Sequence, residues 1–489
     1  MLLTEMYIDK AGLRVYTYDK FCAPAWVPEE GSMIALRTDF SAKEGPVKPM
    51  NAVNNGPAGS AVRQTGNFEA YKEAGFPYAR LHDSAFYGGY GGELSVDVHR
   101  IFRNFDADAD DPASYIFEPT DEYLSNIAAA GTRIFYRLGA AIEHNYKLGT
   151  YPPKDYLKWA KICEHIIRHY NEGWANGFFF GIEYWEIWNE FDCRNQDGSH
   201  PCWQGTFSEF AEFYSVAARY LKGRFPHLRI GGPAFASIWD EAAADAFFKV
   251  MRRDNVPFDF LSYHAYMSTV KSFRDTVAQA NKVFSAYGYG KTEKILNEWN
   301  YVKGWTADLW RYSLRTEKGL KGASFAAACM AEGQRSDLDM LMYYDARPCG
   351  MNGLFDTDFL QPLKGYYVFK AFSALRELGT CARTETESEE LCACAATDGR
   401  THRLLFTRFC DEDAAQTETV KIAVKGVSGP VKATVYATDE ARSMAPLREE
   451  VFTAEEFALY LQAELFGIYL VEIVPVRQGG ENGRTDGHL

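Results

Sequence analysis

Two Asn-Glu pairs, each at the end of a short apolar run, stand out as residues that could do chemistry. One ends the aromatic run at residues 178–190 as Asn189-Glu190, and the other is Asn297-Glu298. The bulky β-forming residues before each pair predict strands, which would place both glutamates at strand ends facing one site. Two carboxyl groups in one site suit acid–base chemistry, because their surroundings can keep one protonated and the other ionised.

The alternative is that Glu190 and Glu298 are structural carboxylates that cap buried strands. The first run also carries Glu183 and Glu186 inside a stretch otherwise suited to burial. A carboxylate in such a place is costly unless it has a partner. These residues therefore need partners from elsewhere in the fold.

A repeated alternation of strands and helices is expected to position the glutamates. Strand follows helix eight times in residues 41–379, which predicts an α/β fold, a (β/α)8 TIM barrel. The glutamates are 298 − 190 = 108 residues apart, or three steps of about 36, against roughly 31 per unit in a barrel of about 250 residues. Active sites of such barrels lie at the C-terminal ends of the strands.

The expected elements have the following bounds. Strands are predicted at residues 48–57, 78–83, 133–138, 178–190, 228–232, 258–266, 294–301 and 339–345. Helices are predicted at residues 61–74, 120–130, 155–176, 208–224, 241–254, 269–286, 318–334 and 366–378.

The pattern changes after residue 379. Residues 380–477 contain short alternating runs without helices long enough for crossovers, which predicts an accessory antiparallel β-sandwich domain. Residues 1–40 also have the pattern of strands outside the barrel, and strands within residues 1–20 are expected to join the sandwich. The Gly- and Asn-rich residues 478–489 are expected to form a disordered tail.

Composition excludes several classes of partner. The formal net charge of the 489 residues is −14, which argues against nucleic acid and anionic membranes because both need a basic surface. No apolar run reaches the length of about 18 residues that a membrane span needs. The first residues lack the basic start and apolar stretch of a secretion signal, so a cytoplasmic location is expected. The sequence leaves open whether the chain forms a homo-oligomer.

Neither a metal nor a cofactor is expected. The acidic residues 106–111 do not match a calcium-binding EF-hand loop, since Asp111 occupies the sixth position, where glycine is needed. The ten cysteines show no CxxC spacing typical of zinc sites. Reduced thiols fit so long a chain, although Cys193 and Cys202 flank a loop next to Glu190 and could form a disulfide.

Three motifs together resemble those of a known family. They are Trp-Glu-Ile-Trp-Asn-Glu at residues 185–190, Tyr-His-Ala-Tyr at 263–266 and Asn-Glu-Trp-Asn at 297–300. This constellation resembles the retaining glycoside hydrolases of clan A, and most closely glycoside hydrolase family 39. That family includes β-xylosidases and α-L-iduronidases, and the resemblance covers most of the barrel.

The resemblance implies roles for individual residues. Glu190 would be the general acid/base, Glu298 the nucleophile and Asn189 a donor to the sugar 2-hydroxyl. Retaining hydrolysis needs these two carboxyl groups about 5–5.5 Å apart. The wall of the subsite that holds the cleaved sugar would be lined by Arg80, His82, His264 and Tyr266.

Two further residues are candidates for contact with substrate. The polar loop after Glu190 could hold Trp203 over a substrate. The eighth strand of the family usually supplies a tryptophan floor under the sugar, whereas this chain has Tyr343, Tyr344 and Asp345 there. Asp345 is therefore included among the substrate-binding residues.

The expected function is that of a metal-independent retaining glycoside hydrolase that cleaves terminal glycosides by double displacement. Its partner would be an oligosaccharide or glycoside substrate, and β-xylosidase is the leading activity. Another specificity stays open, as α-L-arabinosidase, β-glucosidase, β-galactosidase or α-L-iduronidase. A non-catalytic carbohydrate-binding barrel is the alternative from a different class.

Overall fold

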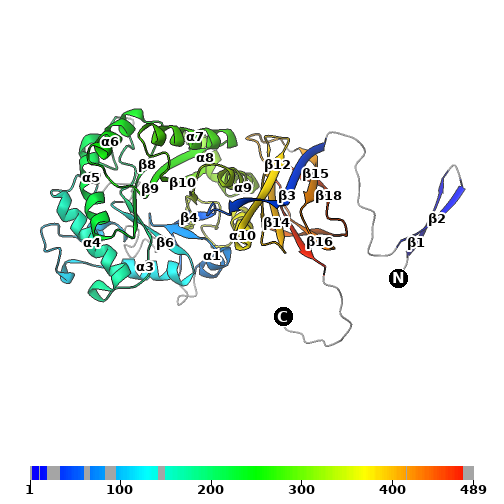
Figure 1. The fold of residues 1–489 in the computed structure, drawn as a ribbon, viewed down its shortest axis with the longest axis horizontal. Coiled ribbons are helices and arrows are strands. Elements are labelled where there is room, and N and C mark those ends of the chain that lie inside the picture. Colours follow the sequence, from blue (N-terminus) through cyan, green and yellow to red (C-terminus); the bar gives the residue numbers. More distant parts are fainter. Residues whose placement is uncertain are drawn as a thin grey trace.

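The computed structural model describes residues 3–9, 12–18, 33–59, 66–82, 95–140, 149–195, 197–414 and 416–476. An eight-stranded barrel surrounded by helices lies beside a nine-stranded sheet (Figure 1). The predicted fold class, a TIM barrel with an accessory β-sandwich, is confirmed.

Eight parallel strands close the barrel. In chain order they are β4 (Ala52–Asn54), β5 (Tyr78–Arg80), β6 (Arg133–Leu138), β7 (Tyr184–Ile187), β8 (Arg229–Phe235), β9 (Phe260–Met267), β10 (Glu293–Tyr301) and β11 (Met340–Tyr343). Strand β11 pairs in parallel with β4, so the barrel has no open edge.

Helices cover the outside of the barrel (Figure 1). They are α1 (Phe68–Ala74), α2 (Val98–Ile101), α3 (Glu118–Ala129), α4 (Tyr156–Glu172), α5 (Phe207–Arg224), α6 (Glu241–Arg253), α7 (Val270–Ala286), α8 (Ala307–Glu317), α9 (Leu320–Arg335) and α10 (Lys364–Leu378). Part of the first predicted helix, residues 61–65, lies outside the described residues.

Side chains inside the barrel form an apolar layer with a polar layer above it. The apolar layer lies toward the N-terminal ends of the strands and contains Ala52, Tyr78, Phe135, Tyr184, Phe260, Ile295, Met340 and Met342. Two residues further along five of these strands come Asn54, Arg80, Glu186, Ser262 and Asn297, all buried. Because strand residues two apart share a face, the polar groups lie above an apolar floor and toward the C-terminal end.

The aromatic run at residues 178–190 is strand only in part, since β7 covers four residues. The backbone N–H groups of Phe178 and Phe180 donate to the carbonyls of His169 and Tyr170 in α4, at 2.6 and 2.9 Å. Phe178 and Phe180, whose rings stack with Tyr170, therefore pack on a helix and not in the barrel, while Phe179 is exposed. High β-propensity alone made the predicted strand too long.

Two helices, not one, connect β10 and β11. The predicted helix at 318–334 corresponds to α9, and α8 at residues 307–317 was not predicted. Few side chains of α8 are buried, so its sequence lacks the wide apolar stripe that marks a helix packed on a core.

The second sheet has the order β17-β16-β19-β14-β13-β12-β3-β15-β18. Its strands are β3 (Met33–Pro46), β12 (Thr380–Thr386), β13 (Leu391–Thr397), β14 (His402–Arg408), β15 (Thr417–Lys425), β16 (Val431–Thr438), β17 (Ala445–Phe452), β18 (Phe457–Glu464) and β19 (Ile468–Pro475). All neighbours are antiparallel except β15 and β3. Residues from both ends of the sheet share one apolar core, as a sandwich requires.

The N-terminal strand that joins this sheet is β3. Strands β1 (Leu3–Asp9) and β2 (Gly12–Tyr18), within the range expected to join it, instead pair with each other. The expected domain boundary after residue 40 falls inside β3, whereas the one after residue 379 falls where α10 gives way to β12. The predicted tail at 478–489 lies outside the described residues.

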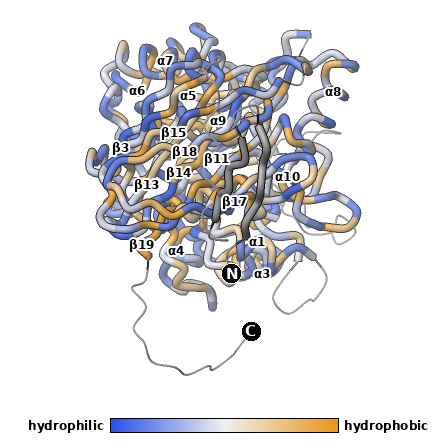
Figure 2. Tube along the Cα trace, turned by 90° about the vertical axis from the view of Figure 1, so that its right-hand side faces the viewer, coloured by the Kyte–Doolittle hydropathy of each residue, from blue (hydrophilic) through white to orange (hydrophobic). Residues whose placement is uncertain are grey.

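Helices α9 and α10 join the barrel to the sandwich by packing against β13 and β14. The apolar core of the barrel continues onto this face of the sheet through Cys392, Cys394 and Leu405. Figure 2, which views the molecule from the sandwich side, shows hydrophobic stretches gathered among these strands. No helix in the described part of the chain combines the length and the apolar character that crossing a membrane requires.

Asp411, after β14, holds a polar contact across this junction. Its carboxylate lies 3.0 Å from Nζ of Lys321 in α9 and accepts hydrogen bonds from Tyr301 at 2.6 Å and Ser268 at 2.9 Å. Burial acts to raise the pKa of Asp411, but the hydrogen bonds from Tyr301 and Lys321 outweigh it and lower that pKa.

We expect Asp411→Ala to lower the free energy of unfolding by about 1–3 kcal/mol, because it removes one carboxylate partner of the largely buried Lys321 and leaves the Tyr301 hydroxyl without its acceptor. Urea denaturation measures the change. The control is Asp308→Ala, whose ion pair with Arg311 is exposed and should cost less than about 0.5 kcal/mol. Equal effects of the two variants would contradict this account of the junction.

Candidate active site

Glu190 and Glu298 lie at the C-terminal ends of β7 and β10. The chain turns sharply after β7, with Trp188 and Glu190 in the left-handed region at φ 75° and 49°. Non-glycine residues rarely adopt this conformation, and it concentrates at functional sites. The backbone N–H of Glu190 donates to the carbonyl of Ala234 on β8 at 2.9 Å, which holds the turn in place.

His264 on β9 lies between the two glutamates. Its Nδ1 is 2.7 Å from Oε1 of Glu190 and 3.5 Å from Oε2 of Glu298. One imidazole nitrogen of His264 and one carboxyl oxygen of each glutamate lie within 4.8 Å of one another. Both carboxyl groups are largely buried, and burial lowers the pKa of His264 to about 4. The imidazole is therefore neutral near pH 7.

Arg80 is a fully buried cation that organises the polar layer. Its Nε donates to Glu186 at 2.6 Å, its Nη2 donates to Asn189 at 2.6 Å, and its Nη1 lies 3.4 Å from Glu298. Burial alone would lower the pKa of Arg80, but the charges of Glu186 and Glu298 more than compensate and raise it. The guanidinium fork thus positions both Asn-Glu motifs at once.

The remaining contacts of Glu298 come from two predicted subsite residues. Tyr266 donates its hydroxyl to Oε1 at 2.6 Å. Burial, together with the charge of Glu298, raises the pKa of Tyr266 well above its usual range. On the other side, Nε2 of His82 lies 3.8 Å from Oε2. Glu298 thus contacts Tyr266 through one carboxyl oxygen and His82 through the other.

Asn189 combines a fixed oxygen with a buried donor. Its Oδ1 accepts from Arg80, which orients the amide. Its Nδ2 is buried and has no hydrogen-bond partner among the described residues. A buried donor of this kind calls for an acceptor, and one supplied by a ligand would satisfy it.

A cavity of about 650 Å³ opens over these groups. Besides the two glutamates, its lining includes His82, Tyr266, Trp305, Trp310, Tyr344 and Arg347. Trp305 and Trp310 were missed because they lie on the loop after β10 and on the unpredicted helix α8. Tyr344 occupies a cavity wall at the end of β11, whereas Tyr343 is buried against Trp299 and Phe369.

The structure does not bring Trp203 into the cavity. Its indole is fully buried, donates to the carbonyl of Thr206 at 3.1 Å and packs edge-on against Trp188. It supports the turn that carries Glu190 from behind, so the prediction that it contacts substrate is corrected. A polar loop around a tryptophan does not reveal which way the ring points.

Asp345 is also fully buried, behind the cavity wall. It accepts a hydrogen bond from Asn55 at 3.3 Å and lies 3.6 Å from Nε of Arg347. Its neighbour Arg347, not Asp345, lines the cavity. Asp345 therefore positions a cavity residue, which corrects its predicted role in direct substrate contact.

Glu186 was noted in the sequence only as a buried carboxylate that needs partners. It accepts from Arg80, from Ser262 at 2.5 Å and from Asn297 at 2.5 Å. The sequence contained one sign that Glu186 faces the barrel interior. Glu186 is an acid in an apolar strand, two residues after Tyr184, which faces the same way.

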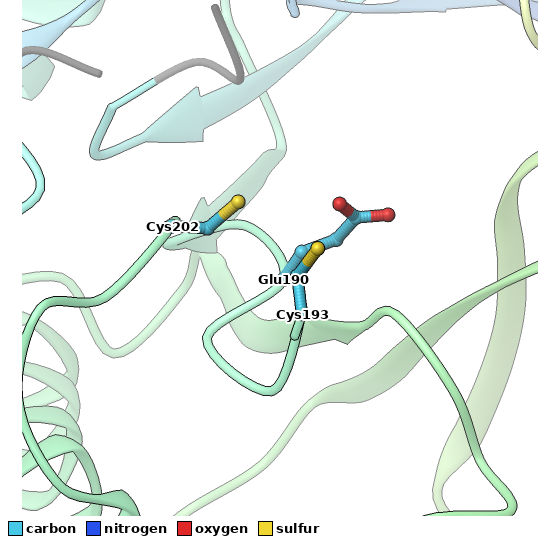
Figure 3. A group of neighbouring side chains, drawn as sticks. All are labelled: Glu190, Cys193 and Cys202. Atoms are coloured by element: carbon cyan, nitrogen blue, oxygen red, sulfur yellow. The ribbon is translucent and has the colours of Figure 1, made fainter. Parts of the chain in front are cut away.

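Two cysteines lie beside Glu190. Cys193 lines the cavity and Cys202 is buried, and Figure 3 shows both side chains next to the Glu190 carboxyl group. Neither forms a disulfide, so the predicted option of a bridge between them is not realised. The sulfurs and a carboxylate oxygen lie within 4.8 Å of one another.

Two groups of side chains at the site have donor atoms close enough to hold a metal ion. They are Glu190 with both cysteines and Glu190 with His264 and Glu298. In the second group, Arg80 already supplies positive charge next to Glu298, which disfavours a further cation.

Asp192 ties the Glu190 turn to the neighbouring loop. Its carboxylate accepts from the backbone N–H groups of Ala236 at 2.8 Å and Ser237 at 3.0 Å. Burial raises the pKa of Asp192 to about 7, in spite of these hydrogen bonds.

This pKa predicts a stability change between about pH 4 and pH 7. The folded pKa exceeds the unfolded value of about 3.9, so the contribution to stability is complete below about pH 4 and is lost as the pH rises through 7. The free-energy difference between wild type and Asp192→Asn should therefore decrease over this range in urea titrations. A difference that does not vary with pH would refute the shifted pKa.

We expect Glu186→Ala to destabilise the fold by about 3–5 kcal/mol, because it leaves the Arg80 charge buried with one partner fewer. Glu186→Gln keeps the shape and an acceptor oxygen, so it should cost clearly less. Chemical denaturation of both variants tests whether Glu186 stabilises the buried Arg80. An alanine variant as stable as wild type would show that Arg80 does not depend on Glu186.

Comparison with known proteins agrees with this geometry. The chain is similar to the beta-xylosidases of Caldicellulosiruptor saccharolyticus (28% identical over 232 residues, 43% of this chain and 41% of that protein) and Geobacillus stearothermophilus (31% over 212 residues, 40% and 38%). These matches span about two fifths of the length of the curated relatives.

Solved structures show the same fold at low sequence identity. A glucosidase from Croceicoccus marinus has a TM-score of 0.74 at 20% identity, covering 91% of this chain and 100% of that one. A monomeric beta-xylosidase from Caulobacter crescentus CB15 has a TM-score of 0.66 at 16% identity, covering 90% and 99%.

The family model described as glycosyl hydrolases family 39 matches residues 56–302, which is half of the chain and includes both Asn-Glu motifs. The chain belongs to glycosyl hydrolase family 39.

Proposed function

We propose that the protein is a retaining glycosidase that removes terminal sugars, with β-xylosides as its leading substrates. The observation that carries the proposal is the approach of Glu190 and Glu298, since one carboxyl oxygen of each lies within 4.8 Å of the other. Retaining enzymes hold their carboxyl groups about 5–5.5 Å apart, whereas inverting enzymes need about 6.5–9.5 Å to admit a water molecule.

Glu298 is the proposed nucleophile. Tyr266 donates a hydrogen bond to its carboxylate, and the Arg80 guanidinium lies 3.4 Å away. This carboxylate attacks the anomeric carbon while the bond to the leaving group breaks, which forms a covalent glycosyl-enzyme. The buried Nδ2 of Asn189 is free to bind the sugar 2-hydroxyl, a contact that strengthens in the transition state.

Glu190 is the proposed acid and base. In the first step it donates a proton to the departing oxygen, and in the second it removes one from the attacking water. Neutral His264, 2.7 Å away, can accept a hydrogen bond from protonated Glu190 or donate one to its carboxylate, depending on the tautomer. One neighbour thus serves both protonation states.

The choice of β-xylosides follows the names of the two curated relatives, both beta-xylosidases. Arg347 in the cavity wall could attract an acidic sugar, but buried Asp345 lies 3.6 Å from its Nε and offsets its charge. This favours a neutral sugar over a uronic acid. The alternatives among neutral sugars are the α-L-arabinoside, the β-glucoside and the β-galactoside.

The proposal is tested by turnover of a panel of aryl glycosides, with the anomeric form of the first product followed by NMR. We expect the β-xyloside to be the best substrate and its product to retain the β configuration. Inversion would reject the double displacement. Sugar binding without release of p-nitrophenol from any member would favour the non-catalytic alternative.

Variants separate the two carboxylates. Glu298→Ala should lower kcat at least about 10³-fold on every substrate, because no other group can form the intermediate. Glu190→Ala should lower kcat/KM by about 10²–10⁴-fold for poor leaving groups and far less for activated ones, with azide restoring turnover. Equal losses on both substrate types without azide rescue would refute the acid/base role.

A further inference from the structure

Two tryptophans at the cavity mouth have no role in the proposed chemistry. Trp305 follows β10 and is 65% exposed, although it lines the cavity. Trp310 in α8 stacks on it, with ring centroids 5.2 Å apart and an interplanar angle of 21°. An exposed tryptophan stacked on a half-buried one at a cavity suggests a surface for a ligand.

The tryptophans lie outward of the catalytic groups. Trp305 packs edge-on against Tyr266, with centroids 5.5 Å apart, and Tyr266 donates to Glu298. Exposure rises along this series from 4% for Glu298 to 65% for Trp305. Below Glu298 the apolar floor closes the barrel, so a substrate enters from the side on which the tryptophans lie.

The segment that carries the tryptophans is held firmly. The backbone N–H of Lys303 donates to the buried hydroxyl of Ser313 at 2.9 Å, and this hydroxyl donates to the carbonyl of Leu309 at 2.7 Å. The Lys303 ammonium pairs with Asp411 at 3.1 Å. Little conformational freedom of the backbone is therefore lost when a ligand binds to it.

We propose that Trp305 and Trp310 form the platform for the leaving group, which stacks a sugar or aryl ring by its flat apolar face. The proposal rests on the proposed function, which puts the cleaved sugar at Glu298 and Asn189 on the deep side of Glu190. The ring released on the outer side of Glu190 then meets the tryptophans. Leu314 and Met351, also in the cavity lining, extend the apolar surface.

The test compares two substrates that share the cleaved sugar. β-1,4-Xylobiose releases a sugar ring, whereas β-xylosyl fluoride releases only fluoride. For Trp305→Ala we expect kcat/KM to fall about 3- to 10-fold on xylobiose and to change less than about twofold on the fluoride. If the aryl glycoside panel selects another sugar, the disaccharide and fluoride of that sugar are used.

The matched control is Trp239→Ala, which removes a tryptophan of similar exposure, 55%, outside the cavity lining. It should leave both substrates unchanged. Equal losses of Trp305→Ala on both substrates, no loss on either, or the same selective loss in Trp239→Ala would each overturn the platform. A wild-type protein that turns over neither substrate would instead reject the proposed function.

A binding measurement tests the platform without turnover. Calorimetry with Glu298→Ala should show phenyl β-xyloside binding about 3- to 10-fold more tightly than methyl β-xyloside. Adding Trp305→Ala should abolish this preference and leave the affinity for the methyl glycoside unchanged. A phenyl preference that survives the double substitution would place the leaving group elsewhere.

Discussion

The buried charge of Arg80 is the constraint on which the rest of the site depends. A guanidinium inside a barrel is tolerable only if carboxylates and amides satisfy it on every side. Here these partners are Glu186 and Asn189 on and just after β7, Glu298 on β10 and Asn54 on β4. One cation thus aligns both Asn-Glu motifs, and this explains why polar residues can lie in the middle of so apolar a barrel.

Because the barrel interior is layered, the site opens toward the C-terminal ends of the strands. Apolar side chains close the barrel below Arg80, and the groups that can exchange protons face the open end. Among the described residues, the opening to Glu190 and Glu298 is therefore on the side of the C-terminal strand ends. A low-dielectric floor also strengthens the interactions between the charges above it.

The sandwich domain supports a loop of the site through Asp411. Asp411 lies after β14, yet its carboxylate contacts Lys303, Lys321 and Tyr301 around the segment that follows β10. The accessory domain thus supports the base of the loop that carries Trp305.

Residue types and their periodicity were sufficient to predict the barrel and to place both Asn-Glu motifs at ends of its strands, because these features depend on local patterns and because parallel strands end at one face. Tertiary packing decided three other features. They are the orientation of Trp203, the short length of β7 within the aromatic run, and the helix that carries Trp310. Whether a ring faces a cavity or a core depends on neighbours far away in the chain. For the same reason, the sequence could show that Glu186 needed partners, but only the assembled barrel could supply Arg80, Ser262 and Asn297.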